Sequence, residues 1–212
     1  MKIALTMEKS QASKNAIVAK VAERICQKYG YEFYNYGVLS PESKVLPSYG
    51  QMAVLTGTIL NAGAADLVLT GCGTGMGALI AANAMPGVEC GFAADPLDAR
   101  LLREVNNPNA VVTPFDKGWG WAAEYNLELM YEEIISSARP NYLSEKTAAA
   151  CIRCKNELDY LKGISSVPFM SFLKECDVEI LKIAFSGENF KKYFYPNACN
   201  HEIAEFVKSI VG

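Results

Sequence analysis

Asp66-Leu67-Val68-Leu69-Thr70-Gly71-Cys72-Gly73-Thr74-Gly75-Met76-Gly77 joins a short apolar run to a glycine-rich run near the middle of the chain. The apolar run presents hydrophobic side chains on both faces, which is typical of a central parallel strand. The glycines let the backbone turn sharply and approach a ligand closely. The segment therefore predicts a buried strand that ends in a binding loop, with a helix directly after it.

Four further strand–helix pairs flank this segment and define the fold class. Apolar residues recur at helical spacing between these strands, and Asp95 followed by Pro96 is a sound helix start. Five strand–helix units predict an α/β fold with a doubly wound, five-stranded parallel sheet. The predicted strands are Lys2–Met7, Glu32–Val38, Asp66–Thr70, Val88–Ala93 and Ala110–Thr113, and the predicted helices are Ala12–Tyr29, Tyr49–Ala62, Met76–Ala84, Pro96–Asn106 and Trp121–Ser137.

The pattern changes after residue 139. Ser144–Lys162, Pro168–Ala184 and Glu202–Val211 have helical spacing, whereas Glu188–Tyr195 is aromatic and irregular. We therefore predict an α/β domain over residues 1–139 and a helical extension over residues 140–212, packed on the domain or on a dimer partner. The aromatic side chains of the extension are expected to cover a dimer surface or a neighbouring active site; they are Phe185, Phe190, Tyr193, Phe194 and Tyr195.

Composition excludes several functional classes. The formal net charge is −3 and no basic stripe interleaves with aromatic residues, so the sequence does not predict a nucleic-acid surface. No apolar stretch approaches the roughly 18 residues that a membrane span needs. Seven cysteines in a chain whose amino end does not resemble a signal peptide indicate reduced thiols and a cytoplasmic protein.

The ligand site is expected at one edge of the sheet, because open α/β sheets bind ligands beyond the carboxyl ends of their strands. This rule brings together Glu8–Lys9, Gly71–Gly77, Asp95 and Pro114–Lys117. The amides of a helix start favour an anion. A cysteine beside them, here Cys72, is usable as a base or nucleophile. An inert cysteine buried in a tight turn is the alternative.

The same loop also fits a loose dinucleotide-binding pattern. Gly73–Ala78 has the glycine spacing of that pattern, and Asp95 lies roughly 20 residues further on. In dinucleotide folds, however, the pattern normally follows the first strand, where this chain has Met7–Ser10 without a glycine. An oxidoreductase that uses NAD or NADP is therefore the less favoured interpretation.

Four motifs together strongly resemble the family of type B ribose-5-phosphate isomerases and galactose-6-phosphate isomerases. They are Gly71–Gly77, Ala81-Ala82-Asn83, Asp95-Pro96 and Asn106-Asn107. The resemblance covers residues 1–137. It implies a flavodoxin-like or Rossmann-like fold, an aldose–ketose isomerase that needs neither metal nor cofactor, and a homodimer or dimer of dimers with the site at the subunit interface.

The resemblance also implies a role for each matching residue. Cys72 would remove the proton next to the carbonyl of the open-chain sugar phosphate. Thr74 and the loop amides would hold the enediolate oxygens, a task that suits amides oriented towards developing negative charge. The residues implied in substrate binding are Lys9, Gly73, Gly75, Met76, Gly77, Asp95, Asn106 (across the dimer interface), Lys117 and Arg139.

This chain departs from the family pattern at four places around the site. Glu8-Lys9 stands where the family has Asp-His, Leu46-Pro47-Ser48-Tyr49 where it has Tyr-Pro-His-Tyr, Val105 where it has His, and Lys117 where it has Arg. We therefore expect either that Glu8 or Lys9 transfers the proton in ring opening, or that the substrate differs from ribose 5-phosphate. The function predicted is an isomerase of ribose 5-phosphate or galactose 6-phosphate type that works through a cis-enediol. A non-catalytic sugar-phosphate-binding protein is the alternative.

Overall fold

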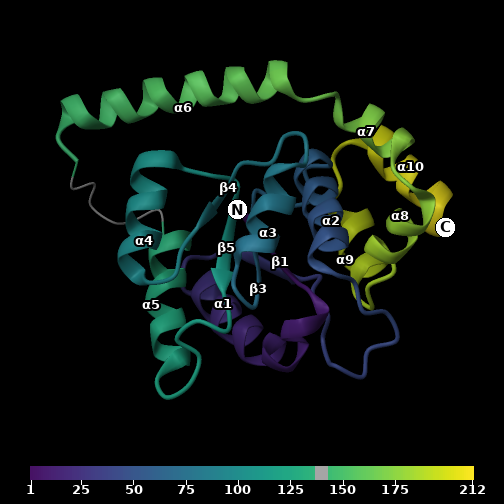
Figure 1. Cartoon of the computed structure of the whole chain (residues 1–212), viewed down its shortest axis with the longest axis horizontal. Coiled ribbons are helices and arrows are strands. Elements are labelled where there is room, and N and C mark those ends of the chain that lie inside the picture. Colours follow the sequence, from purple (N-terminus) through teal and green to yellow (C-terminus); the bar gives the residue numbers. More distant parts are fainter. Residues whose placement is uncertain (137–142) are drawn as a thin grey trace.

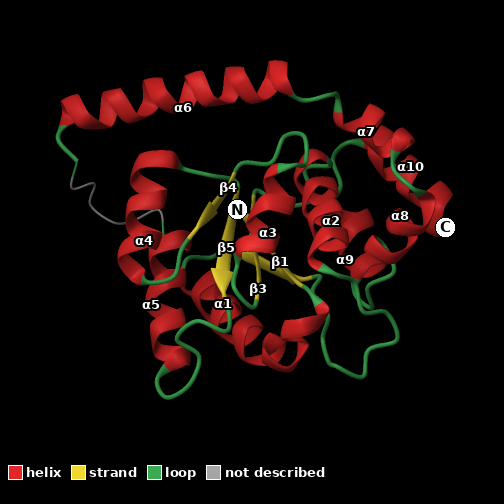
Figure 2. Cartoon of the chain, in the orientation of Figure 1, coloured by secondary structure: helices red, strands yellow, loops and turns green. Residues whose placement is uncertain are grey.

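The computed structural model describes residues 1–136 and 143–212 and contains one five-stranded sheet. The strand order is β2-β1-β3-β5-β4, and every neighbouring pair is parallel, which confirms the predicted doubly wound α/β fold (Figure 2). The strands are β1 (Lys2–Met7), β2 (Glu32–Asn35), β3 (Leu67–Cys72), β4 (Cys90–Phe92) and β5 (Ala110–Pro114).

Helices cover both faces of the sheet. One face packs on α1, α4 and α5, and the other on α2 and α3. The predicted first helix begins instead with a 3-10 turn, and the predicted fourth helix ends in a π-helical turn, η2. The bounds are η1 (Lys9–Lys14), α1 (Asn15–Lys28), α2 (Tyr49–Asn61), α3 (Met76–Asn83), α4 (Pro96–Leu101), η2 (Leu102–Asn106) and α5 (Ala123–Ile135).

The C-terminal part of the chain is helical, and none of its described residues, 143–212, belongs to a strand. The range predicted as a single helix over Pro168–Ala184 is two helices, because Asp177 caps a new one by accepting hydrogen bonds from the amides of Glu179 and Ile180. The helices are α6 (Glu145–Ser165), α7 (Phe169–Glu175), α8 (Val178–Ala184), α9 (Phe190–Asn197) and α10 (His201–Val211).

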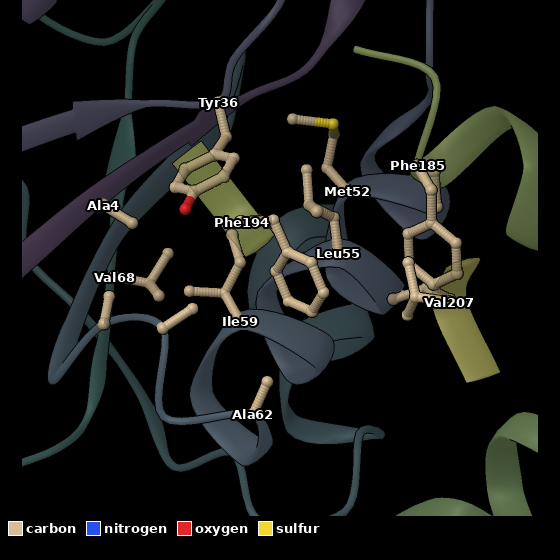
Figure 3. Close-up of a cluster of buried hydrophobic side chains, with 14 of the residues drawn as sticks. Ala4, Tyr36, Met52, Leu55, Ile59, Ala62, Val68, Phe185, Phe194 and Val207 are labelled. Carbon is tan, nitrogen blue, oxygen red and sulfur yellow. The ribbon is translucent and has the colours of Figure 1, made fainter. Parts of the chain in front are cut away.

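The expected interface role of the aromatic cluster is wrong for its three phenylalanines, and Glu188–Tyr195 is not irregular. Phe190 and Phe194 lie on α9, where their rings stack 4.8 Å apart, and Phe185 stacks on Phe190 at 5.3 Å. All three are buried in the same core as residues of α2 and the sheet. Figure 3 shows Phe185 and Phe194 in this core. These rings therefore anchor the extension to the sheet of their own chain.

Helix α6 differs from every other long helix because none of its residues is buried. Figure 1 shows it in green, running along one side of the molecule beyond α4. Lys155 tethers it to Glu89 through an ion pair of 2.9 Å, and Lys162 donates to the carbonyl of Asn83. Among the described residues, no helix is long and apolar enough to cross a membrane.

Candidate active site

Three of the predicted segments meet at the carboxyl edge of the sheet. Met7 is the register partner of Gly71, and Gly71 is in turn the partner of Thr113. The chain leaves β1 towards β2 on one side, while β3 lies on the other side of β1, so the loop after β3 stands at a topological switch point. The sequence prediction that residues after β1, β3 and β5 converge is confirmed.

The glycine-rich loop has a conformation that depends on two of its glycines. A Cβ atom on Gly71 would collide with the carbonyl oxygen of Thr113 and the ring of Phe115. Gly75 has φ +78° at the N-cap of α3, and a Cβ atom there would lie 2.6 Å from the ring of Phe92. Larger residues at these positions would therefore displace the strand beside the loop or the start of the helix.

Cys72 is the last residue of β3 and is 7% exposed. It packs in a small cluster with Ala78 of α3 and Val112 of β5, and its carbonyl accepts a hydrogen bond of 3.0 Å from the amide of Phe115. The thiol therefore lies between the loop and the first turn of α3. Burial raises the pKa of the Cys90 thiol, which packs against the same cluster, to about 12.

The residues that follow Cys72 form the outer part of the loop. Thr74 is exposed, and its Oγ1 accepts a hydrogen bond of 3.3 Å from the amide of Met76, which leaves its hydroxyl hydrogen free to donate. Gly77 lies against the ring of Tyr49, the first residue of α2, since a Cβ atom there would be 3.2 Å from that ring. Tyr49 is about half exposed and was not among the predicted site residues.

Glu8 and Lys9 follow β1 but differ in their surroundings. Glu8 is buried and caps η1, because its carboxylate accepts hydrogen bonds from the amide and the hydroxyl of Ser10. Lys9 is exposed, and its amide donates to the carbonyl of Pro47 at 3.0 Å. Of the two residues, Lys9 thus has the side chain that faces solvent at this edge, whereas Glu8 has an established capping role.

The other predicted substrate residues are spread more widely. Lys117 is exposed and follows β5, whose last residue, Pro114, is the register partner of Cys72. Asp95 caps α4 at the end of β4. Since β5 lies between β4 and β3, this end is about 10 Å across the sheet from β3. Asn106 precedes β5 and so lies at the amino edge of the sheet. The length of β5, about 13 Å, separates this edge from Cys72. Arg139 lies outside the described residues.

Sequence reasoning missed an ion pair at this edge between Lys14 of η1 and Asp116 after β5. The carboxylate of Asp116 fills the space that a Cβ atom on Gly73 would need, and the amide of Asp116 donates to the carbonyl of Gly73 at 2.9 Å. The two residues are 102 positions apart, so no local spacing in the sequence could have joined them.

Among residues 1–136 and 143–212, no group of three or more His, Cys, Asp or Glu side chains could hold a metal ion. What the carboxyl edge offers is a thiol beside a helix start, the exposed hydroxyl of Thr74, the backbone amides of the loop, and the cationic side chains of Lys9 and Lys117. A base next to oriented donors suits a reaction in which negative charge develops on oxygen. The fold and this edge define an α/β protein with a candidate small-molecule site at the switch point of its sheet.

The chain belongs to the Ribose/Galactose Isomerase family, whose model matches residues 3–116. A second family model, described as Ribose-5-phosphate isomerase, matches residues 154–210 and so falls within the helical extension. The family predicted from the four motifs is confirmed. The extension thus has counterparts among related proteins.

Three individual relatives illustrate the similarity. Ribose-5-phosphate isomerase B of Escherichia coli (strain K12) is 33% identical over 98 residues, which cover 46% of this chain and 60% of that protein, less than two thirds of its length. A crystal structure of 4-deoxy-L-threo-5-hexosulose-uronate ketol-isomerase with a tartrate is 44% identical, with a TM-score of 0.95 over 99% of both chains. A ribose-5-phosphate isomerase from Vibrio parahaemolyticus is 36% identical, with a TM-score of 0.94 over 100% of this chain and 99% of the other.

Proposed function

We propose that the chain is an aldose–ketose isomerase that acts on a phosphorylated pentose or hexose through a cis-enediol, with Cys72 as the base. The observation that carries this proposal is the position of Cys72, at the end of a central strand and directly before the glycine-rich start of α3. Membership of the Ribose/Galactose Isomerase family supports the same reaction class.

In the proposed mechanism, the Cys72 thiolate removes the proton from the carbon next to the carbonyl of the open-chain sugar. The electron pair left on carbon forms the double bond of the enediol, and negative charge develops on the former carbonyl oxygen. The Thr74 hydroxyl and the loop amides donate hydrogen bonds to that oxygen. The hydroxyl proton on the carbon that lost its hydrogen moves to the former carbonyl oxygen, so that this carbon becomes the new carbonyl. Cys72 returns its proton to the former carbonyl carbon, which yields the isomer without a cofactor.

Ring opening is assigned to the segment after β1. Since Ser10 engages the carboxylate of Glu8, the exposed Lys9 is the better placed of the two residues to exchange a proton with a ring oxygen. Glu8 would then act by fixing the turn that carries Lys9. A Lys9→Met variant should lose activity on ring-forming sugars while it still isomerises an aldose phosphate that cannot close a ring.

A second substrate class is favoured by one specific observation. The relative that is 44% identical over nearly the whole chain, extension included, is a ketol-isomerase of a deoxy-hexosulose uronate. Lys117 provides a point charge where the family has a planar arginine, so its position suits a single carboxylate as well as a phosphate. The second candidate substrate is therefore a keto-sugar acid whose anionic end is a carboxylate.

NMR in deuterated water tests reaction and substrate together. Ribose 5-phosphate, galactose 6-phosphate, 4-deoxy-L-threo-5-hexosulose uronate, ribose and galactose would each be incubated with the protein. We expect deuterium at the carbon next to the carbonyl in the product of a phosphorylated sugar, or of the uronate if the second candidate holds. Thermal stabilisation by these sugars without any deuterium uptake would contradict the proposed isomerase function and favour a non-catalytic binding protein.

We also propose that the protein works as a homodimer or a dimer of dimers with a shared site. Asn106 is exposed at the amino edge of the sheet, so it is too far from Cys72 of its own chain to touch the same sugar. Large apolar side chains are also exposed on three helices, and α6 buries none of its own residues. They are Met76 and Ile80 on α3, Leu97 and Leu101 on α4, and Ile152, Leu161 and Ile164 on α6.

Mixing two inactive variants tests the shared site. In a two-fold dimer, a hybrid of Cys72→Ser and Asn106→Ala subunits contains one intact site, so random exchange should restore about a quarter of the wild-type activity. A mixture that stays inactive although the subunits exchange would contradict the shared site. Sedimentation of the wild-type protein as a monomer would contradict the dimer itself.

A further inference from the structure

Lys14 is a cation at the carboxyl edge that is already fully engaged. Its Nζ atom donates to Gln11 Oε1 at 2.8 Å, to the carbonyl of Phe115 at 2.7 Å and to Asp116 Oδ1 at 2.5 Å. An ammonium group has three N–H donors, so none is left for a substrate anion. The side chain is 16% exposed and lies over the ring of Trp119. Lys14 therefore serves as a clamp between η1 and the loop after β5.

Gln11 holds the second oxygen of the same carboxylate. It is buried, and its Nε2 atom donates to Asp116 Oδ2 at 3.2 Å and to Ser10 Oγ at 3.1 Å. The hydrogen bonds thus run from Glu8 through Ser10 and Gln11 to Asp116. Both oxygens of Asp116 are fixed by side chains from the segment after β1.

Asp116 nevertheless remains open to a ligand, since its side chain is 59% exposed. A carboxylate has about four acceptor positions, and Lys14 and Gln11 use two of them. The carboxylate lies against Gly73, the residue that follows Cys72. A sugar held by the Cys72 loop would therefore extend within reach of it.

The charge of this carboxylate defines which part of a substrate it can accept. An anionic phosphate or carboxylate would be repelled, whereas a sugar hydroxyl can donate a hydrogen bond to it. We propose that Asp116 is a specificity-determining residue, whose carboxylate, oriented by Lys14 and Gln11, accepts a hydrogen bond from a hydroxyl group of the sugar away from the reacting carbons. This inference rests on the proposed isomerase function.

The test combines variants of Asp116 with sugars that lack one hydroxyl. Ribose 5-phosphate and galactose 6-phosphate are each compared with their 3-deoxy and 4-deoxy analogues, and the uronate with its 3-deoxy analogue. The series used is that of the parent sugar that the wild-type protein isomerises. For each sugar, the kcat/KM of the Asp116 variant is divided by that of the wild-type protein. Differences in ring opening between the sugars therefore cancel.

A hydrogen bond to a charged group changes kcat/KM by about 10- to 100-fold. We expect Asp116→Asn to lose that factor on the parent sugar and on every analogue but one. The exception is the sugar that lacks the recognised hydroxyl, on which Asp116→Asn and wild type should be equally active. Asp116→Glu, which keeps the charge, should restore part of the discrimination.

Equal losses on all sugars would overturn the inference and leave Asp116 as a purely structural residue. If Asp116→Asn does not fold, Gln11→Leu provides the same comparison, because it frees one oxygen of Asp116 and should weaken the discrimination. Failure of the proposed function has a different signature, since the wild-type protein itself would then isomerise none of the parent sugars.

Discussion

Lys14 Nζ lies 2.5 Å from Asp116 Oδ1, and this ion pair joins the 3-10 turn after β1 to the loop after β5. The hydrogen bond from Lys14 holds the pKa of the Asp116 carboxyl below its ordinary value. The folded-state pKa is therefore lower than the unfolded one. The pair stabilises the fold at pH values above the ordinary aspartate pKa of about 3.9, and the contribution is lost as the pH falls through the lowered value.

Replacing Lys14 by Met should accordingly destabilise the protein more at pH 7 than at pH 3. Thermal denaturation of wild type and Lys14→Met across this range measures the difference in melting temperature. Lys182→Met is a matched control, because Lys182 forms an exposed pair with Glu179 on α8, and such pairs contribute little. If the melting temperatures of wild type and Lys14→Met differ by the same amount at both pH values, this role of the pair is contradicted.

The loop glycine Gly75 provides a prediction with an internal control. Gly75 and Gly118 have φ of +78° and +72°, so alanine strains the backbone at both positions. Only at Gly75 does the added Cβ atom meet another residue, the ring of Phe92. We expect Gly118→Ala to lower the free energy of unfolding by about 1 kcal/mol and Gly75→Ala by about 2–4 kcal/mol. Urea denaturation measures both, and equal losses would show that Phe92 does not restrict the loop.

The core position of Phe194 predicts that the extension is needed for stability. Phe194 is fully buried, and Figure 3 shows it beside Leu55 and Ile59 of α2. Phe194→Ala should lower the free energy of unfolding by about 3–5 kcal/mol. Tyr125→Ala, at an exposed aromatic residue of α5, should change it by no more than about 0.5 kcal/mol. A small effect of Phe194→Ala would mean that α9 does not share the core of the sheet.

The sheet could be predicted because its signals are local. Apolar runs followed by glycine, or by Asp-Pro, mark the end of a strand and the start of a helix within a few residues. The helix α9 could not be recognised in this way, since its aromatic residues suggested an irregular segment and Pro196 lies inside the helix. The i, i+4 spacing of Phe190 and Phe194 was the signal that could have indicated it.

In the candidate site, too, only the features with local sequence signals could be predicted. The loop and Cys72 follow from one contiguous motif, and their meeting with the ends of β1 and β5 follows from parallel strands. The capping of Glu8 and the clamp formed by Lys14 depend on side-chain packing between segments far apart in sequence. Periodicity and spacing contain no information on such contacts, so the hydrogen bonds of Asp116 and Gln11 were found only in the structure.

If Cys72 moves the proton, two cysteine variants should differ sharply in activity. Cys72→Ser and Cys90→Ser both alter the small cluster around Val112, but burial raises the pKa of Cys90 to about 12, so only Cys72 is expected to act as a base. The measurement is deuterium uptake at the carbon next to the carbonyl, followed by NMR with the sugar that the wild-type protein isomerises. We expect a loss of about 100- to 10,000-fold for Cys72→Ser and wild-type exchange for Cys90→Ser. Full exchange activity in a folded Cys72→Ser variant would show that Cys72 is not the base.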